Sequence, residues 1–298
     1  MQLHATSLDS TSADTIGGVV SLGARRRRFH SSQLFIHIIL ILMVALVLAP
    51  FFWMVLGSFK NYADLITRPS QLPSPWTLAN YREIFGVANF GGAFVNSFLI
   101  AAARTLLACA TSVVIGYVFA KYTFWGKNFL FTVLLSTMLI PFPAIMVALY
   151  LKLAAFNLLN SLLGLVMVAV FSTFGAFLLR QWISGIPDAF IEAARIDGAN
   201  EFWIIARIIT PLSAAPLAAL AIFTFLGSWD DFLFPGIVLT DPAVHTLPLA
   251  LAGLRSLFWE RYEIFAAGAM VTVIPVMILY AFMQKHFVRG LTMGGTKE

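Results

Sequence analysis

Long uncharged runs alternate with short charged segments along most of the chain. A helix needs roughly 20 apolar residues to cross the hydrocarbon core of a bilayer. Six runs lie between charged residues, namely Phe29–Phe59, Thr105–Ala120, Asn128–Leu151, Leu153–Leu179, Ile208–Trp229 and Ile264–Gln284. All but Thr105–Ala120 are long enough alone, and that run is expected to include residues before Arg104. The pattern predicts an all-α integral membrane fold with six transmembrane helices.

The composition also indicates that most of the protein surface faces lipid. Hydrophobic residues make up 60% of the 298 residues and charged residues 11%, whereas soluble chains are about half apolar and a quarter charged. One membrane domain is therefore favoured over two soluble ones. The single cysteine, Cys109, lies in an apolar run and offers neither a disulfide nor a CxxC metal site.

The distribution of lysine and arginine predicts the orientation of the chain. If the N-terminus is cytoplasmic, twelve of the 19 basic residues fall on the cytoplasmic side, as the positive-inside rule requires. The short segment Lys121–Lys127 and the C-terminal tail carry most weight, because short loops follow the rule best. Both termini are therefore expected in the cytoplasm.

The same pattern divides the chain into segments. We expect a cytoplasmic tail (1–32), a first transmembrane helix (33–59), an external loop rich in proline and glycine (60–91), a transmembrane core (92–284) and a cytoplasmic tail (285–298). A twin-arginine signal at Arg26–Phe29 is the alternative for the first segment. The apolar run behind it exceeds a usual signal core, which favours an uncleaved helix.

The longest polar insert on the predicted cytoplasmic side, 181–207, reads as two short helices joined by a glycine turn. Pro187 suits a first helical position, Gly198 stops the first helix, and Asn200 can cap the second. Two acidic residues suit the positive end of the first helix dipole: Asp188 and Glu192. On this pattern alone, an interfacial hairpin without a partner is as good an interpretation as a docking element.

The insert also resembles a known motif. Glu192-Ala193-Ala194, with Gly198 four residues on and then Ile208 and Pro211, is similar to the EAA loop (187–211) of type I ABC importer permeases, although Thr210 stands where that pattern has leucine. Further stretches resemble the carbohydrate-uptake branch, and in particular its maltose-permease-like smaller subunit: Gly57–Lys60, Asn96-Ser97, Pro141, Leu149-Tyr150, Ile186–Asp188, Ser228–Phe232 and Gly290–Lys297.

The resemblance implies a type I importer permease of the bacterial inner membrane, with the insert as a coupling helix. It implies a second permease subunit, two ATPase subunits that bind ATP and Mg, an extracytoplasmic solute-binding protein and a carbohydrate-like solute. The residues implied in ATPase coupling are Glu192, Ala193, Ala194, Asp197, Gly198, Gly294 and Gly295. The chain has no GxxxxGK[ST] loop, so it is expected to be no enzyme and to hold no cofactor itself.

Charged residues in membrane segments are costly and mark functional positions. Arg104, Asp230 and Asp231 are expected at a similar outer depth, and we hypothesise that Arg104 pairs with one aspartate or shares a polar cavity with both. With neighbouring aromatic residues they form a candidate substrate pathway: Arg104, Trp229, Asp230, Asp231 and Phe232. The alternatives are an arginine that extends to the interface, aspartates that meet water, and an interfacial tryptophan.

Two other classes of function remain to be weighed. An ion-gradient-driven secondary transporter would show corresponding acidic residues or broken helices in two repeats, and no convincing repeat is visible. An intramembrane enzyme would need a catalytic motif, and the chain has neither HExxH nor GxSxG. Copurification of an ATPase separates the importer from both.

Overall fold

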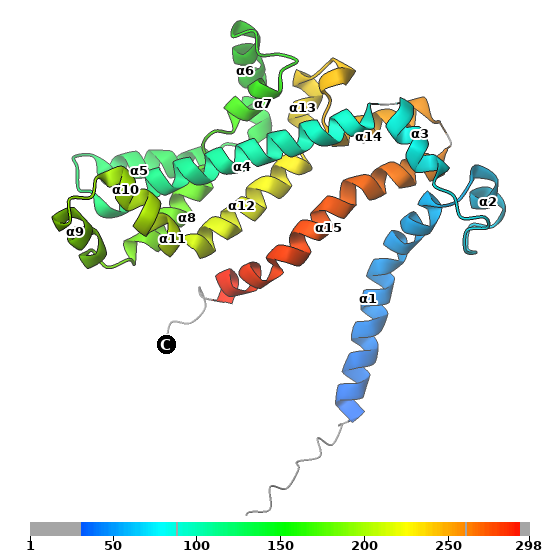
Figure 1. The fold of residues 1–298 in the computed structure, drawn as a ribbon, viewed down its shortest axis with the longest axis horizontal. Helices are drawn as coiled ribbons and strands as arrows, with labels where there is room; N and C mark the ends of the chain where they lie inside the picture. The colour runs from blue at the N-terminus through cyan, green and yellow to red at the C-terminus, as the bar shows by residue number, and fades with distance from the viewer. Residues whose placement is uncertain (1–30, 88, 260, 293–298) are drawn as a thin grey trace, which may run out of the picture. The chain divides into compact units, whose positions relative to one another are not determined.

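The computed structural model describes residues 31–87, 89–259 and 261–292, and every regular element in these ranges is helical (Figure 1). The elements are α1 (Ser31–Ser58), α2 (Tyr62–Thr67), α3 (Ala79–Val87), α4 (Phe90–Lys121), α5 (Lys127–Ser136), η1 (Thr137–Leu139), α6 (Phe142–Ala155), α7 (Leu162–Val168), α8 (Thr173–Ser184), α9 (Ala189–Ile196), α10 (Glu201–Ile204), η2 (Ile205–Ile209), α11 (Thr210–Leu212), α12 (Ala214–Trp229), α13 (Leu233–Val238), η3 (Pro242–Val244), α14 (Leu247–Leu257) and α15 (Tyr262–Thr292).

The chain divides into two units, Met1–Ala49 and Pro50–Glu298, with the boundary inside α1. In the described part of the first unit, every side chain from Leu34 to Ala49 is exposed. A helix that is apolar on all sides is suited to lipid or to another membrane helix. The first unit therefore contributes a surface for the bilayer, and the packed core belongs to the second unit.

Three unbroken helices are long and apolar enough to span a membrane: Leu34–Ser58, Phe90–Lys121 and Tyr262–Phe282. Three further pairs qualify only together, because each is bent by more than 40° at a short break. The predicted number of six holds if each bent pair is one span. In the last helix, the backbone continues beyond the expected end at Gln284 to Thr292.

Prolines account for the two sharpest bends. Lys127–Leu139 and Phe142–Ala155 meet at 99°, where Pro141 caps α6 in an extended conformation and Pro143 occupies its first turn. Glu201–Leu212 and Ala214–Trp229 meet at 84°, just after Pro211. Proline has no N–H for the carbonyl four residues earlier, so both sites lose helical hydrogen bonds.

Lys152, which ends one of the uncharged runs, does not end a helix. The helix α6 continues through Lys152 to Ala155, and the break before α7 follows it. A lysine at the end of a helix can extend its ammonium group to water while its backbone remains helical. A charged residue therefore marks the depth of a span better than its last helical residue.

The segment 60–91, expected as an external loop, contains α2 and α3, and internal hydrogen bonds hold it together. The Lys60 side chain, 1% exposed, donates to the carbonyls of Arg68 (2.7 Å) and Pro69 (3.1 Å). The Asn80 amide donates to the carbonyls of Ser58 and Lys60. Because buried carbonyls need donors, Lys60 has a structural use that the charge pattern does not reveal.

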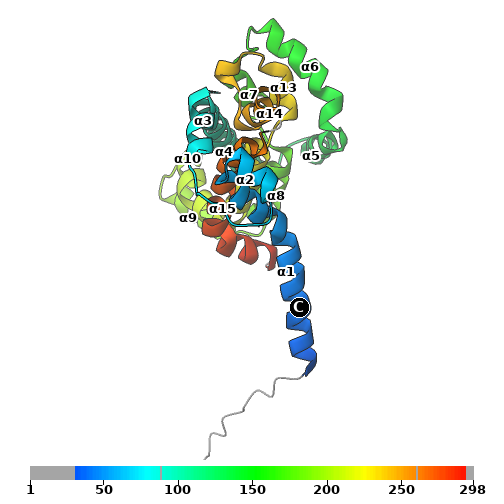
Figure 2. The same cartoon turned by 90° about the vertical axis from the view of Figure 1, so that its right-hand side faces the viewer.

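In the second unit, α8 and α12 pack along α4 more extensively than any other helices (Figure 1). Figure 2 views α4 from its end, with α8 close to it. Glycines permit the close approach of α4 and α8. A Cβ atom at Gly116 would lie 2.7 Å from Leu179 Cβ, and one at Gly175 would lie 2.2 Å from Ser112 Oγ. Small residues let membrane helices approach this closely.

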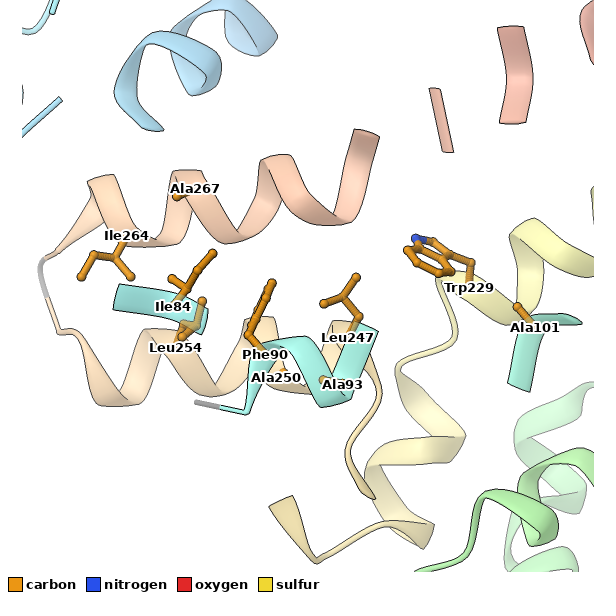
Figure 3. Close-up of a cluster of buried hydrophobic side chains, with 10 residues drawn as sticks. All are labelled: Ile84, Phe90, Ala93, Ala101, Trp229, Leu247, Ala250, Leu254, Ile264 and Ala267. Carbon is orange, nitrogen blue, oxygen red and sulfur yellow. The ribbon is translucent and has the colours of Figure 1, made fainter. Parts of the chain in front are cut away.

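Apolar side chains at the α14–α15 end of the second unit form one buried cluster (Figure 3). Ile84, Phe90 and Leu254 are at most 1% exposed and lie between α14 and α15. Trp229 extends the cluster to the end of α12 and is fully buried. A second cluster joins α4, α8 and α12 to the polar insert, so the insert is anchored to the membrane helices by apolar packing.

Candidate functional site

The insert forms what we call the α9–α10 hairpin, residues 187–204. As predicted, a helix, a glycine turn and a second helix follow one another. Gly198 has φ +81°, a left-handed conformation that glycine adopts without steric cost. Its N–H donates to the Arg195 carbonyl at 3.1 Å. Residues 193–198 therefore close α9 in the way a C-terminal glycine does.

Side-chain caps begin the second helix as expected. The Asn200 side chain accepts from the Trp203 N–H at 2.8 Å, which confirms the predicted cap. The first helix starts slightly later than predicted, because Asp188 is its cap residue and Pro187 precedes the cap. Pro187 thus restricts the backbone conformation just before the helix instead of occupying its first position.

The hairpin has one face for the membrane core and one that is exposed. Ile191 and Ala194, three residues apart, are 3% and 7% exposed and belong to the cluster shared with α4 and α8. Glu192 and Ala193 are exposed. Four of the predicted coupling residues line one groove of about 610 Å³ between the two short helices: Ala193, Ala194, Asp197 and Gly198.

Large apolar side chains are exposed on the hairpin, and two of them, Phe190 and Trp203, line the groove. Phe190 is 52% exposed, Ile196 85%, Phe202 80% and Trp203 48%. Exposed apolar patches with a polar rim mark interaction surfaces. The hairpin therefore presents a surface suited to another protein, and its small alanines leave the backbone accessible.

A polar network joins the hairpin to the end of α4. The Tyr117 hydroxyl donates to Glu201 Oε2 at 2.7 Å, and Arg195 Nε donates to Glu201 Oε1 at 2.9 Å. Arg195 also lies over the Tyr122 ring and donates to its hydroxyl at 3.4 Å. Glu201 therefore bridges α9, α10 and α4 with its two carboxylate oxygens.

Arg195 and Tyr122 keep their protons at neutral pH. The hydrogen bond with Glu201 raises the pKa of Arg195. Burial, followed by the nearby Glu201 carboxylate, raises the pKa of Tyr122. Since both ordinary pKa values already lie well above 7, the network keeps its charges across the physiological pH range.

A second polar link lies at the start of the hairpin. Lys121, the last residue of α4, forms an ion pair with Asp188 at 2.6 Å and donates to the Ile186 carbonyl. Sequence reasoning used Lys121 for topology alone and did not identify Tyr117, Tyr122 or Glu201. The only feature of the sequence that could have pointed to these residues was a tyrosine near the end of an apolar run.

Arg104 lies at a junction of three helices. Its guanidinium donates to the Leu165 carbonyl through Nε (3.0 Å) and Nη2 (2.8 Å). Nη1 donates to Asp231 at 3.0 Å and to Ser228 at 3.3 Å. Leu165 is among the last four carbonyls of α7, which have no partner within the helix. The pair hypothesised for Arg104 and one aspartate is thus present, with Asp231 as the partner.

The five predicted pathway residues differ in accessibility. Asp230 and Phe232 are exposed, Asp231 keeps 21% of its side chain exposed, and Arg104 is 6% exposed. Trp229 is fully buried. Figure 3 shows its indole at the side of the cluster where α12 ends. A role for these residues in a substrate pathway stays a prediction, and Asp230 and Phe232 are the members best placed to meet a solute.

The indole of Trp229 is held from three sides. Its ring stacks on Phe225 at 5.9 Å and meets the edge of Phe94 at 5.5 Å, and its N–H donates to the Thr272 carbonyl at 3.1 Å. A buried tryptophan with a satisfied N–H is typical of a core position. In this conformation, Trp229 orients the end of α12 and has no exposed surface for a solute.

Two predicted coupling residues, Gly294 and Gly295, lie outside the described residues. Within the described ranges, no group of three or more His, Cys, Asp or Glu side chains is placed to hold a metal ion.

Comparison with known proteins adds a consistent set of relatives. The model of the family described as binding-protein-dependent transport system inner membrane component matches residues 112–293. The arabinooligosaccharides transport system permease protein AraQ of Halalkalibacterium halodurans is 36% identical over 252 residues, which is 83% of this chain and 90% of the relative. The diacetylchitobiose uptake system permease protein NgcG of Streptomyces coelicolor is 31% identical over 262 residues, 87% of each chain.

A solved structure shares the fold. It is a bacterial ABC transporter involved in the import of the acidic polysaccharide alginate. One of its chains matches with a TM-score of 0.77 at 21% sequence identity, over 87% of this chain and 98% of that chain.

Proposed function

Because the chain belongs to the family of binding-protein-dependent transport inner membrane components and is a permease of such an importer, we propose that its solute is a sugar or a sugar-like compound. The relatives above are named for oligosaccharide uptake. The α9–α10 hairpin carries the mechanistic part of the proposal, because it presents the Glu-Ala-Ala pattern and its glycine turn on an exposed apolar surface.

The energy for transport comes from a separate ATPase. In this proposal, the ATPase covers the groove at Ala193 and Gly198, and closure of two ATPase subunits around ATP displaces the hairpin of each permease. Glu192 lies on the exposed face and is available for a polar contact. The tail around Gly294 and Gly295 extends between the ATPases.

The permease has a fixed orientation in the bacterial inner membrane. Both termini and the hairpin are cytoplasmic, in agreement with the distribution of basic residues. The loop 60–91 and α14 are then external, where a solute-binding protein delivers the solute. The segments expected from the sequence, with the first helix at 33–59 and the core at 92–284, follow from this orientation.

A second permease subunit completes the pathway, and the exposed apolar side chains of α1 fit a lipid or helix partner. The exposed Asp230 carboxylate and Phe232 ring offer a hydrogen-bond acceptor and an apolar face. Sugar rings present hydroxyl groups and apolar C–H faces, so these two residues are the proposed solute contacts in this chain.

The central test replaces Gly198 by proline. Proline fixes φ near −65° and has no N–H, whereas Gly198 has φ +81° and donates to Arg195. We expect the turn to break, and ATP hydrolysis stimulated by the binding protein to fall to the basal rate. The measurement is ATPase activity in liposomes of the chain coexpressed with its genomic neighbours, with and without the binding protein and a panel of sugars.

Gly126→Pro is the matched control, because Gly126 also has a positive φ of 79° and lies in a turn outside the hairpin. It is expected to leave stimulated hydrolysis measurable wherever the complex assembles. If no ATPase copurifies with the wild-type chain, or if Gly198→Pro retains full stimulation, the hairpin is not a coupling element. An ion-gradient-driven carrier is then the function to test.

A further inference from the structure

The end of α4 is linked to both short helices of the α9–α10 hairpin. Lys121 holds the start of the hairpin through Asp188 and the Ile186 carbonyl. Tyr117, one turn earlier, holds the second short helix through Glu201. Each attachment joins residues more than 60 positions apart in the sequence. The hairpin is therefore fixed to a helix with which it has no direct chain connection.

Apolar packing supports the same link. Tyr117 is 1% exposed, and its cluster contains Ile191 of α9 and Ile204 of α10, which are 3% and 0% exposed. The tyrosine thus places its ring in the shared core and its hydroxyl on the Glu201 carboxylate. A hydroxyl fixed in this way is pre-positioned for one partner.

The members of the network do not contribute equally. Arg195 and Glu201 keep 46% and 44% of their side chains exposed, and an exposed ion pair contributes little because water screens it. The bond from Tyr117 to the carboxylate is short and partly buried, and hydrogen bonds to charged groups are the stronger kind. Tyr117 and Glu201 therefore form the principal link, which Arg195 orients.

The helix α4 also carries Arg104 and so connects the hairpin with the junction around that residue. Tyr117 and Arg104 lie on one unbroken helix, α4, roughly 20 Å apart at 1.5 Å per residue. Arg104 binds Asp231 directly, next to the exposed Asp230 and Phe232. A displacement of the hairpin that carries α4 with it therefore reaches the proposed solute contacts.

We propose that the Tyr117–Glu201 link, oriented by Arg195, makes the hairpin and α4 move as one body, so that displacement of the hairpin is transmitted to the Arg104–Asp231 junction. Tyr117, Glu201 and Arg195 are positioning residues that contact neither ATP nor solute. The inference rests on the proposed function, because an ATPase must move the hairpin. It adds the path that this movement takes through the chain.

The test measures whether the distance between hairpin and α4 depends on nucleotide. Spin labels are placed at Ala189→Cys on the hairpin and Leu106→Cys on α4, both of which are exposed and outside the groove, in a Cys109→Ala background. Pulsed electron paramagnetic resonance is recorded on the complete complex with its ATPase in nanodiscs, without nucleotide and with Mg-ATP and vanadate. With the network intact, we expect one narrow distance that is the same in both states.

Loss of the Tyr117–Glu201 link should let the hairpin separate from α4 only when the ATPase moves. For Tyr117→Phe and Glu201→Ala, we expect a second distance to appear with Mg-ATP and vanadate, with a population roughly tenfold higher than in the unmodified network. Glu201→Gln keeps an acceptor for Tyr117 and should largely restore the single distance. Arg195→Gln should have a smaller effect than Tyr117→Phe. Tyr150→Phe, at a tyrosine of α6, is the matched control.

Two results would overturn the inference. One is a wild-type distance that changes with nucleotide, since the hairpin would then move independently of α4. The other is a Tyr117→Phe or Glu201→Ala complex that is less stable but keeps one nucleotide-independent distance, since the contacts would then be merely structural. Absence of a copurifying ATPase would overturn the proposed function, and with it the inference, and it is seen before any distance is measured.

Discussion

Replacing Gly175 by alanine is expected to prevent α4 and α8 from packing in their present positions. The added Cβ would lie 2.2 Å from Ser112 Oγ and 2.7 Å from Leu220 Cδ2. Both partners are buried, Ser112 at 0% and Leu220 at 1% exposed. Overpacking of a core costs about 1–3 kcal/mol, and occasionally more. The expected result is loss of most monodisperse protein on size-exclusion chromatography and a lower thermal unfolding temperature.

Two further variants separate this clash from a general effect of alanine. Ser112→Gly removes the hydroxyl at 2.2 Å and the Cβ at 3.0 Å from the new methyl group, so it should partly restore the Gly175→Ala protein. Gly227→Ala lies in α12 with no atom within 4 Å of the added Cβ, and its stability should remain near wild type. Equal stability of Gly175→Ala and Gly227→Ala would contradict the close approach of α4 and α8.

Local signals predicted the parts of the fold that depend on neighbouring residues. The α9–α10 hairpin could be read from Gly198 and Asn200 because a left-handed turn and a side-chain cap each need particular residue types. The pairing of Arg104 with an aspartate was also accessible. A charge in an apolar run is costly unless paired, and few candidates existed in the chain.

Features that depend on distant contacts were not accessible. Trp229 next to two carboxylates reads equally as an interfacial residue, and its burial depends on Phe94, Phe225 and the Thr272 carbonyl. The link between Tyr117 and Glu201 joins residues 84 positions apart. No periodicity or motif brings these positions together, because their proximity follows from how α4 packs against the hairpin.

The bends in the spans depend on both local residues and distant contacts. Pro141 and Pro211 lie at the two sharpest bends, yet proline in a membrane helix gives anything from a mild kink to a break. The 99° and 84° angles observed here depend on what the flanking segments pack against. Proline therefore marks two of the three bends, while the 46° bend between α7 and α8 has none at its break. Tertiary packing determines how far each span bends.

Replacing Arg104 by methionine is expected to have the second largest effect. The substitution keeps most of the side-chain volume but removes the donors to Asp231, Ser228 and the Leu165 carbonyl. Removing one partner of a buried ion pair costs about 3–5 kcal/mol, because the other charge stays buried. Since Asp231 retains 21% exposure of its side chain, a loss near the lower end, about 3 kcal/mol, is expected.

Variants of the two neighbouring carboxylates show whether the Arg104 junction stabilises the fold or contacts the solute. Asp231→Asn removes the counter-charge of the buried Arg104 but keeps an acceptor and the bonds to the Leu165 carbonyl, so it should cost less than Arg104→Met. Asp230→Asn changes an exposed side chain and should leave stability unchanged. Thermal unfolding of the purified complex measures all three, and uptake in liposomes is recorded beside it. If Arg104 instead served to contact solute, Arg104→Met would abolish uptake at unchanged stability. Because each donor nitrogen of Arg104 already has a partner within the chain, we expect stability to fall first and uptake to fall with it.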